Sequence, residues 1–268
     1  MNPVSLSDLV SGMMNGATLK RAVAITFDDG YVDNLSAGAP VLEEYDVPAT
    51  MFVVSSKRGR GFWWDELARI IYSASALPAE LALTIKGRGF QRSIQQSDEQ
   101  ASRNRLIVDL YRRLRPLSSR DKEDSMIQLG EWAGVPFDPE MPEPSTRTMF
   151  PEELVELASS RLLDVGSHSL THPILPTIPS DSVQVEVRRS KSELEDIIGK
   201  PVSKFSYPDG ATSRAVQAEV RSAGYMCACS SQPGLAGKRS GLFALPRIWP
   251  LNRNGEQFER WIRTWANG

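Results

Sequence analysis

The residues best suited to chemistry in this 268-residue sequence are its two histidines, His168 and His172, which lie four positions apart. Two imidazoles and a carboxylate form a common ligand set for a divalent metal ion that keeps open positions for water and substrate. Pro173 disfavours the helical conformation at His172, so we expect a turn here. The spacing alone is equally typical of surface or capping histidines, but the sequence holds no other histidine.

Two adjacent aspartates, Asp28 and Asp29, precede Gly30 and are the candidate carboxylates. Such a pair before a glycine is often only a turn or a helix cap. Because adjacent residues that leave a strand point in different directions, one carboxylate could bind a metal while the other serves as general base for water. A neighbouring cation would hold both carboxylates ionised at neutral pH.

Each of three polar clusters directly follows a short apolar segment that is predicted to be a strand. The strands are predicted over residues 21–27, 162–166 and 202–206, and the clusters are Asp28–Gly30, His168–His172 and Tyr207–Gly210. The carboxyl ends of parallel strands lie on one face of an α/β sheet or barrel, and that face carries the active site. We therefore expect the three clusters to converge.

An alternation of strands and helices continues on both sides of a segment of different character. Helices are predicted near 40–45, 151–159, 183–198, 213–223 and 256–265, with further strands near 48–55, 225–230 and 243–248. Residues 57–147 instead show helical periodicity at 65–74, 103–115 and 121–134. We expect one α/β domain over 1–268 with a largely helical insertion at about 57–147. Its arginine-rich faces are expected to be solvated, with binding of an anionic substrate as the alternative.

The composition excludes several classes of protein. Lys and Arg number 31 against 33 Asp and Glu, so the basic excess of a nucleic-acid-binding protein is missing. No apolar segment approaches the roughly 18 residues that cross a bilayer, and no signal-peptide pattern opens the sequence, so we expect a cytoplasmic protein. Cys227 and Cys229 are expected to be buried free thiols on one face of a strand.

Three motifs, taken in order, resemble those of a known family. They are Thr26-Phe-Asp-Asp-Gly30, His168-Ser-Leu-Thr-His172-Pro and Phe205-Ser-Tyr-Pro-Asp-Gly210. Together they are similar to the first three motifs of the polysaccharide deacetylases, carbohydrate esterases of family 4 with the NodB homology domain. The resemblance implies a distorted (β/α)7 barrel. It also implies removal of N-acetyl groups from amino sugars of a poly- or oligosaccharide or a glycan precursor.

The resemblance also implies roles for the matching positions. Asp28 resembles the catalytic base. The implied metal ligands are Asp29, His168 and His172, and the ion is usually Zn²⁺, with Co²⁺, Ni²⁺ or Mn²⁺ as alternatives. Activated water would attack the N-acetyl carbonyl, and the backbone N–H of Asp209 would help to stabilise the resulting oxyanion.

The chain departs from the family pattern where a proton donor is needed. Ser206 stands in the place of the arginine of the third motif, and no histidine remains to protonate the leaving amine. We hypothesise that Arg247, in Leu245-Pro-Arg-Ile248, supplies the missing guanidinium and orients Asp28; an ordinary surface arginine is the alternative. Because arginine cannot act as an acid near neutral pH, Asp28 or solvent would protonate the amine.

Tyr207 and Trp64 are the candidate substrate contacts. Trp64 lies in Phe62-Trp-Trp-Asp65, which could form an aromatic sugar platform or anchor the inserted helices. Two alternatives to a deacetylase remain open: a non-catalytic carbohydrate-binding relative, which would need no base, and a hydrolase of another amide such as a formamide or cyclic imide. The sequence leaves the oligomeric state undefined.

Overall fold

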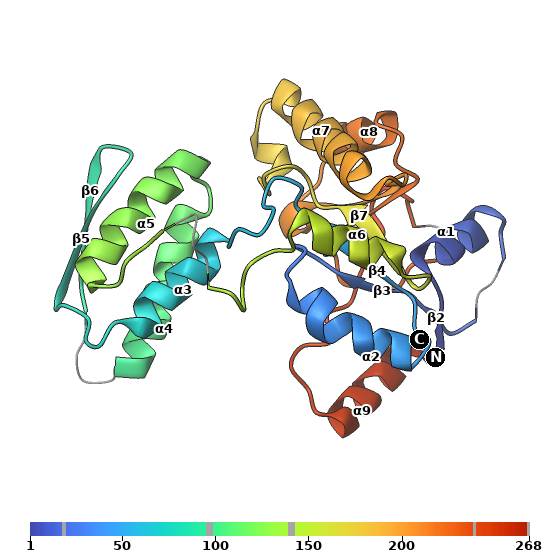
Figure 1. Cartoon of the computed structure of the whole chain (residues 1–268), viewed down its shortest axis with the longest axis horizontal. Helices are drawn as coiled ribbons and strands as arrows, with labels where there is room; N and C mark the ends of the chain where they lie inside the picture. The colour runs from blue at the N-terminus through green and yellow to red at the C-terminus, as the bar shows by residue number, and fades with distance from the viewer. Residues whose placement is uncertain (18–19, 95–98, 139–142, 238–239, 267–268) are drawn as a thin grey trace. The chain divides into compact units, whose positions relative to one another are not determined.

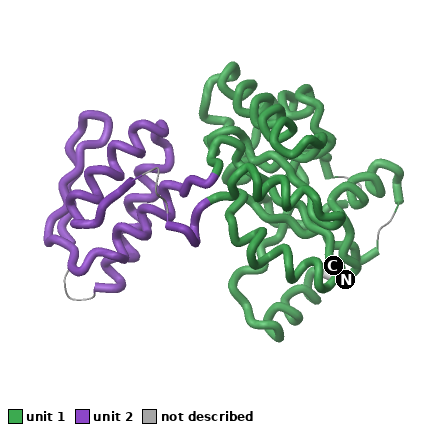
Figure 2. Tube along the Cα trace, in the orientation of Figure 1, with its two compact units in different colours: residues 1–58, 148–268 green, residues 59–147 purple. Residues whose placement is uncertain are grey.

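The computed structural model describes residues 1–17, 20–94, 99–138, 143–237 and 240–266. It divides the chain into two compact units (Figure 2). The first comprises Met1–Arg58 and Thr148–Gly268, and the second comprises Gly59–Arg147.

A parallel sheet of five strands, in the order β3-β4-β7-β8-β9, forms the centre of the first unit (Figure 1). The strands are β3 (Ile25–Phe27), β4 (Ala49–Val53), β7 (Leu163–Ser167), β8 (Lys204–Ser206) and β9 (Cys227–Cys229). The sheet curls into a half-barrel, and Leu245 extends it through one parallel bridge to Cys229. The α/β class is as expected. Within the described residues, however, the strand expected at 243–248 forms only this bridge, and a seven-stranded barrel is not seen.

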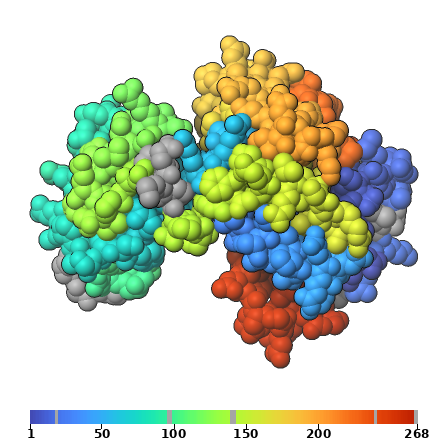
Figure 3. All heavy atoms as spheres, viewed as in Figure 1, coloured from blue at the N-terminus to red at the C-terminus, as the bar shows by residue number. Residues whose placement is uncertain are grey.

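Most helices of this unit pack against the sheet, and a short strand pair lies outside it. The helices are α1 (Leu6–Met14), α2 (Ala39–Glu44), α6 (Pro151–Ser159), α7 (Ser180–Ile198), α8 (Arg214–Ser222) and α9 (Gly255–Ala266), with short turns at Asn34–Gly38, Leu175–Thr177 and Pro208–Gly210. The pair is β1 (Asn2–Pro3) with β2 (Ala22–Val23). The space-filling view shows atoms of α2, α6 and α7 over one side of this unit (Figure 3). The core between helices and sheet includes Met51, Val165, Val187, Leu194 and Phe205.

The register of the sheet aligns the strand ends that precede the polar clusters. All five residues of β4 are buried, as expected of a central parallel strand covered on both faces. Val53, its last residue, pairs with Ser167 of β7, and Ser167 pairs with Phe205 of β8. The residues that follow these strands therefore leave the sheet at the same edge.

The second unit contains three helices and a β-hairpin. They are α3 (Trp63–Ser73), α4 (Glu99–Leu114), α5 (Ser119–Ala133) and the antiparallel pair β5 (Glu80–Ile85) and β6 (Arg88–Ser93). The expectation of a largely helical insertion missed the hairpin. Leu81 and Leu83 alternate with exposed residues, and Lys86 and Gly87 both have positive φ, as two-residue hairpin turns require. The unit has its own core, which includes Leu67, Leu106 and Leu129.

Two further expectations concern burial and membranes. Cys227 and Cys229 are buried free thiols, as predicted, and burial raises the pKa of each to about 12. None of the helices in the described part of the chain combines the length and apolar character that a bilayer-spanning segment needs.

Candidate metal centre

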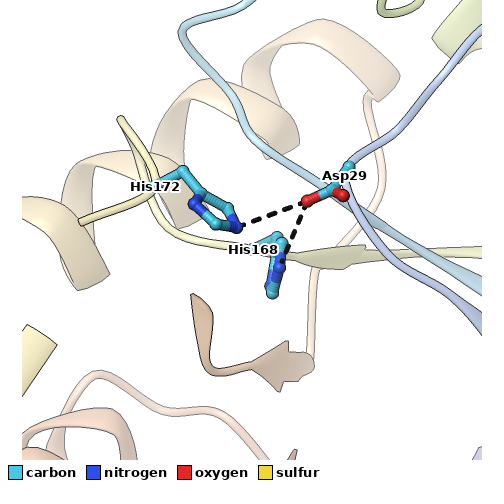
Figure 4. Close-up of side chains that lie close together, drawn as sticks. All are labelled: Asp29, His168 and His172. Carbon is cyan, nitrogen blue, oxygen red and sulfur yellow. Dashed lines mark ion pairs between the residues drawn. The ribbon is translucent and has the colours of Figure 1, made fainter. Parts of the chain in front are cut away.

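The structure brings Asp29, His168 and His172 together at the carboxyl edge of the sheet (Figure 4). Asp29 Oδ1 lies 3.5 Å from His168 Nε2 and 3.4 Å from His172 Nε2. Ligand atoms bound about 2.1 Å from one tetrahedral ion would lie roughly 3.4 Å apart. The aspartate cluster and the histidine cluster therefore converge as expected, and their donor atoms are spaced to share one cation.

The environment of these donors fits a divalent cation. Asp29 Oδ1 is buried and finds no hydrogen-bond partner among the described residues. Burying such an oxygen without a partner costs free energy, which a cation would offset. His168 is 2% exposed, and its Nδ1 lies 2.8 Å from the carbonyl oxygen of Ser206. A proton on Nδ1 donated to that carbonyl leaves the lone pair of Nε2 facing Asp29, the tautomer that metal binding requires.

The loops that carry the ligands have unusual backbone conformations. Asp29, Ser169 and His172 have φ values of 74°, 66° and 63°, in the left-handed region that residues other than glycine seldom occupy. Gly30 also has positive φ, and a Cβ there would lie 3.1 Å from Val53 Cγ1. Backbone strain of this kind persists only where the surrounding structure holds it, and it concentrates at functional sites.

Arg247 forms a bidentate ion pair with Asp28. Its Nη1 donates to Asp28 Oδ1 at 2.8 Å, and its Nη2 donates to Oδ2 at 2.6 Å. The same guanidinium donates to Thr26 Oγ1, Ser206 Oγ and the carbonyl oxygen of Ser230. All five of its N–H groups are thus used, which fixes the orientation of both side chains. This is the contact that the hypothesis of a replacement guanidinium requires.

The electrostatics of the site favour an ionised carboxylate and a neutral imidazole. Burial alone would raise the pKa of Asp28, but the facing His168 and the Arg247 guanidinium outweigh it, and the pKa lies below its usual value. Burial lowers the pKa of His168 below its usual value despite the attraction of Asp28 and Asp29. A neutral imidazole is the form that binds a metal.

Two other predicted site residues lie in the turn after β8. Asp209 has a φ of 57° and is exposed, and its backbone leaves the sheet at the same edge as the candidate metal ligands. The expectation that Tyr207 contacts substrate is wrong. Tyr207 is fully buried, and its hydroxyl donates to the carbonyl oxygen of Phe243 at 2.9 Å, so it is a core residue.

Trp64 belongs to the second unit. Its ring stacks on Phe62, with centroids 4.3 Å apart and planes 10° from parallel. Phe62 is buried, so this pair contributes to packing within that unit. A contact between Trp64 and substrate stays a prediction.

Two contacts of this site were not anticipated from the sequence. The carbonyl oxygen of Ser230 accepts from Arg247, and Glu186 accepts from the loop between the histidines. A backbone carbonyl leaves no mark in the sequence. Glu186 does leave one, because it is an acidic residue between Val183 and Val187 on the apolar face of a predicted helix.

The comparison with known families now identifies the class of protein. The sequence matches the family described as polysaccharide deacetylase over residues 15–77 and 126–228, more than half of the chain. The chain therefore belongs to the polysaccharide deacetylase family, which confirms the resemblance of the three motifs.

One curated relative and several solved structures are similar to the chain. YxkH of Bacillus subtilis (strain 168), whose name assigns it provisionally to the polysaccharide deacetylases, is 25% identical over 229 residues. The match covers 85% of this chain and 51% of YxkH, so the chain spans about half the length of this relative.

The solved structures support the fold. The Streptococcus pyogenes deacetylase PplD, in complex with acetate, is 16% identical with a TM-score of 0.59, over 98% of this chain and 78% of PplD. IcaB from Ammonifex degensii is 13% identical with a TM-score of 0.58, over 100% and 82%. The deacetylase domain of BpsB from Bordetella bronchiseptica is 17% identical with a TM-score of 0.57, over 92% and 78%. At these identities the likeness concerns the fold alone.

Proposed function

We propose that this chain is a metal-dependent hydrolase that removes N-acetyl groups from amino sugars of a poly- or oligosaccharide or a glycan precursor. The observation that carries the proposal is the position of Asp28, held by Arg247, beside the cluster of Asp29, His168 and His172. Membership of the polysaccharide deacetylase family supports it. Acetate bound to the structurally similar PplD is consistent with acetyl as the acyl group removed.

Asp29, His168 and His172 would hold the metal. Two imidazoles and a carboxylate suit Zn²⁺ best, and Co²⁺, Ni²⁺ and Mn²⁺ suit the same donors. A divalent cation bound there supplies a Lewis acid that activates water and polarises the substrate carbonyl. The buried Asp29 Oδ1 and the neutral His168 both favour its binding.

Asp28 acts as the base. As the oxygen of water forms its bond to the carbonyl carbon, Asp28 takes the proton that is released. Because the low pKa keeps Asp28 ionised, the base is in its active form across the neutral range. Arg247 uses one lone pair of each carboxylate oxygen, so lone pairs remain to accept that proton.

The same carboxyl then serves as the acid. The negative charge on the former carbonyl oxygen is stabilised in part by the backbone N–H of Asp209. When the C–N bond breaks, the proton passes from Asp28 to the amine nitrogen, leaving acetate and a free amino sugar. A carboxyl of lowered pKa is a strong proton donor, which compensates for the missing histidine.

Acetate release tests this function. The Zn²⁺-loaded chain, incubated with N-acetylated chitooligosaccharides, is expected to release acetate, and Asp28→Asn is expected to abolish the release. Asp46→Asn, which alters an exposed aspartate paired with Arg161, is the matched control and is expected to keep full activity. Full activity in Asp28→Asn would contradict the role of the base.

The two alternatives give different results when N-formylated sugars and a cyclic imide are assayed beside the chitooligosaccharides. Formate release or ring opening, without acetate release, would identify a hydrolase of another amide. Binding of the oligosaccharide by the metal-loaded wild type, without any hydrolysis, would identify a non-catalytic carbohydrate-binding protein.

A further inference from the structure

Helix α7 carries three polar side chains on the face that it turns toward the sheet: Glu186, Ser190 and Glu193. Their spacing of four and three residues places them on one helical stripe. Ser190 is fully buried, with its Oγ 2.7 Å from Ser167 Oγ, and Glu193 accepts from Ser55 Oγ at 3.2 Å. The stripe therefore follows the carboxyl edge of β4 and β7, where the metal ligands lie.

Glu186 contacts the loop between the two histidines. Its Oε2 accepts the backbone N–H of Leu170 at 3.0 Å and that of Thr171 at 2.8 Å. Its Oε1 accepts from Thr171 Oγ1 at 2.6 Å. The residue is 8% exposed, and all three donors lie between His168 and His172, so one buried carboxylate holds the middle of this loop.

These hydrogen bonds hold a loop that needs support. Ser169 and His172 both have positive φ, which costs free energy for residues with a side chain. Hydrogen bonds to a carboxylate are stronger than those between neutral groups, and burial increases their strength further. The strand edge holds the same loop from the other side, because Ser55 donates its backbone N–H to the carbonyl oxygen of Ser169.

We propose that Glu186 is a positioning residue: it fixes the loop in the conformation that directs His168 and His172 toward one cation. In the part of the chain that the structure describes, the hydrogen bonds of Glu186 go to the backbone and the hydroxyl of the loop. The inference rests on the proposed metal site and deepens it, because it explains how a strained loop keeps two imidazoles in register.

The test measures Zn²⁺ affinity and the visible absorption spectrum of the Co²⁺-loaded protein in Glu186 variants. Glu186→Ala is expected to weaken Zn²⁺ binding about 10- to 100-fold, the range typical of groups that orient metal ligands, and to alter the Co²⁺ spectrum. Glu186→Gln keeps the reach of the side chain, and its amide oxygen can still accept both N–H groups. We therefore expect Glu186→Gln to recover Zn²⁺ affinity to within about tenfold of the wild type.

Glu186→Asp separates positioning from charge. It keeps the negative charge but shortens the side chain by one methylene, so it loses the reach to the loop. If Glu186 acts by positioning the loop, Glu186→Gln should bind Zn²⁺ more tightly than Glu186→Asp. If its negative charge attracts the cation instead, Glu186→Asp should bind Zn²⁺ more tightly. If Glu186→Ala fails to fold, the comparison of Glu186→Gln with Glu186→Asp still tests the proposal.

Glu195→Ala is the matched control. Glu195 lies on the same helix, and among the described residues its hydrogen bonds come from the backbone N–H of Val202 at 2.8 Å and from Lys191 Nζ rather than from the histidine loop. Its loss is expected to leave Zn²⁺ affinity and the Co²⁺ spectrum unchanged. Wild-type affinity in Glu186→Ala, or an equal loss in Glu195→Ala, would overturn the role of Glu186. Absence of Zn²⁺ binding in the wild type would instead overturn the proposed metal site.

Discussion

Asp28 and Arg247, 219 positions apart in the sequence, share two parallel hydrogen bonds in which each carboxylate oxygen accepts from one Nη atom. The pair joins the end of β3 to the segment that follows β9. Because the guanidinium also donates to Thr26 of β3 and Ser206 of β8, it links the proposed base to both of these strands.

Arg247→Lys should lower kcat/KM for acetate release by more than about tenfold, because an ammonium cannot reproduce two parallel hydrogen bonds. The loss of these bonds also raises the pKa of Asp28 toward its ordinary value. The acidic limb of the pH profile, which requires an ionised base, should therefore move to higher pH. Measurement of kcat/KM against pH checks both effects.

Arg188→Lys is the control for this substitution, since Arg188 is an exposed arginine that pairs with Glu219 at 2.7 Å. It should keep the wild-type profile. An unchanged acidic limb in Arg247→Lys would show that the guanidinium does not set the ionisation of Asp28.

The chain should bind one Zn²⁺ ion, and this binding should raise the midpoint of thermal unfolding. A ligand that binds only the folded state stabilises it by about 2.7 kcal/mol when its concentration is 100 times the dissociation constant. His172→Ala removes one of the three proposed protein ligands and should abolish most of this stabilisation. Differential scanning calorimetry with and without chelator measures it. Equal Zn²⁺-dependent shifts in the wild type and His172→Ala would place the ion elsewhere.

Gly210→Ala should impair acetate release while leaving Zn²⁺ affinity unchanged. Gly210 has a φ of 65°, and a Cβ there would lie 2.4 Å from the backbone nitrogen of Ser231, so the turn that contains Asp209 must shift. Gly199→Ala is the matched control, because Gly199 has a φ of 66° with open space around it.

Both alanine variants should lose about 1–2 kcal/mol of unfolding free energy from the backbone conformation alone. Only Gly210→Ala should lose activity. Equal activity in the two variants would argue against a role for the Asp209 backbone in the reaction.

The buried thiols predict a loss of stability at alkaline pH. Unfolded cysteine ionises near 9, whereas Cys227 and Cys229 stay protonated in the folded protein until about pH 12. Above pH 9 the unfolded state binds fewer protons than the folded state, so the free energy of unfolding falls as pH rises. At pH 10 the loss is about 1.4 kcal/mol for each thiol.

Between pH 7 and pH 10, the free energy of unfolding of Cys227→Ala should therefore fall by about 1.4 kcal/mol less than that of the wild type, as measured by urea unfolding. Met226→Ala alters the neighbouring residue without removing an ionisable group, so its free energy of unfolding should change with pH as that of the wild type does. The same pH dependence in Cys227→Ala as in the wild type would contradict the buried, protonated state of this thiol.

The convergence of Asp29 with His168 and His172 was predictable because their clusters follow β3 and β7, and strand ends in a parallel sheet lie at one edge. Arg247 could be inferred only as a replacement for a group missing at Ser206. Tyr207 shows the limit of such reasoning. Adjacent residues at a strand end point to opposite sides, so Ser206 faces Arg247 while Tyr207 enters the core.

Glu186 and the hairpin illustrate two other limits. The partners of Glu186 lie on a loop 15 and more positions away, and no local pattern specifies that α7 packs over this loop. The β5–β6 hairpin did have a local signal in its alternating leucines. The Lys86-Gly87 turn nevertheless lacks the asparagine or aspartate that most often marks such turns.

The parallel pairing of β4 with β7 has a consequence for folding. Val53 pairs with Ser167 across the whole of residues 59–147, so this central contact has a high contact order and closes a long loop of chain. Residues 59–147 have their own core. If they collapse independently, the flexible part of the loop becomes shorter and the entropic cost of closing it falls. Substitutions that loosen this core should therefore slow the formation of the sheet, even though they lie outside it.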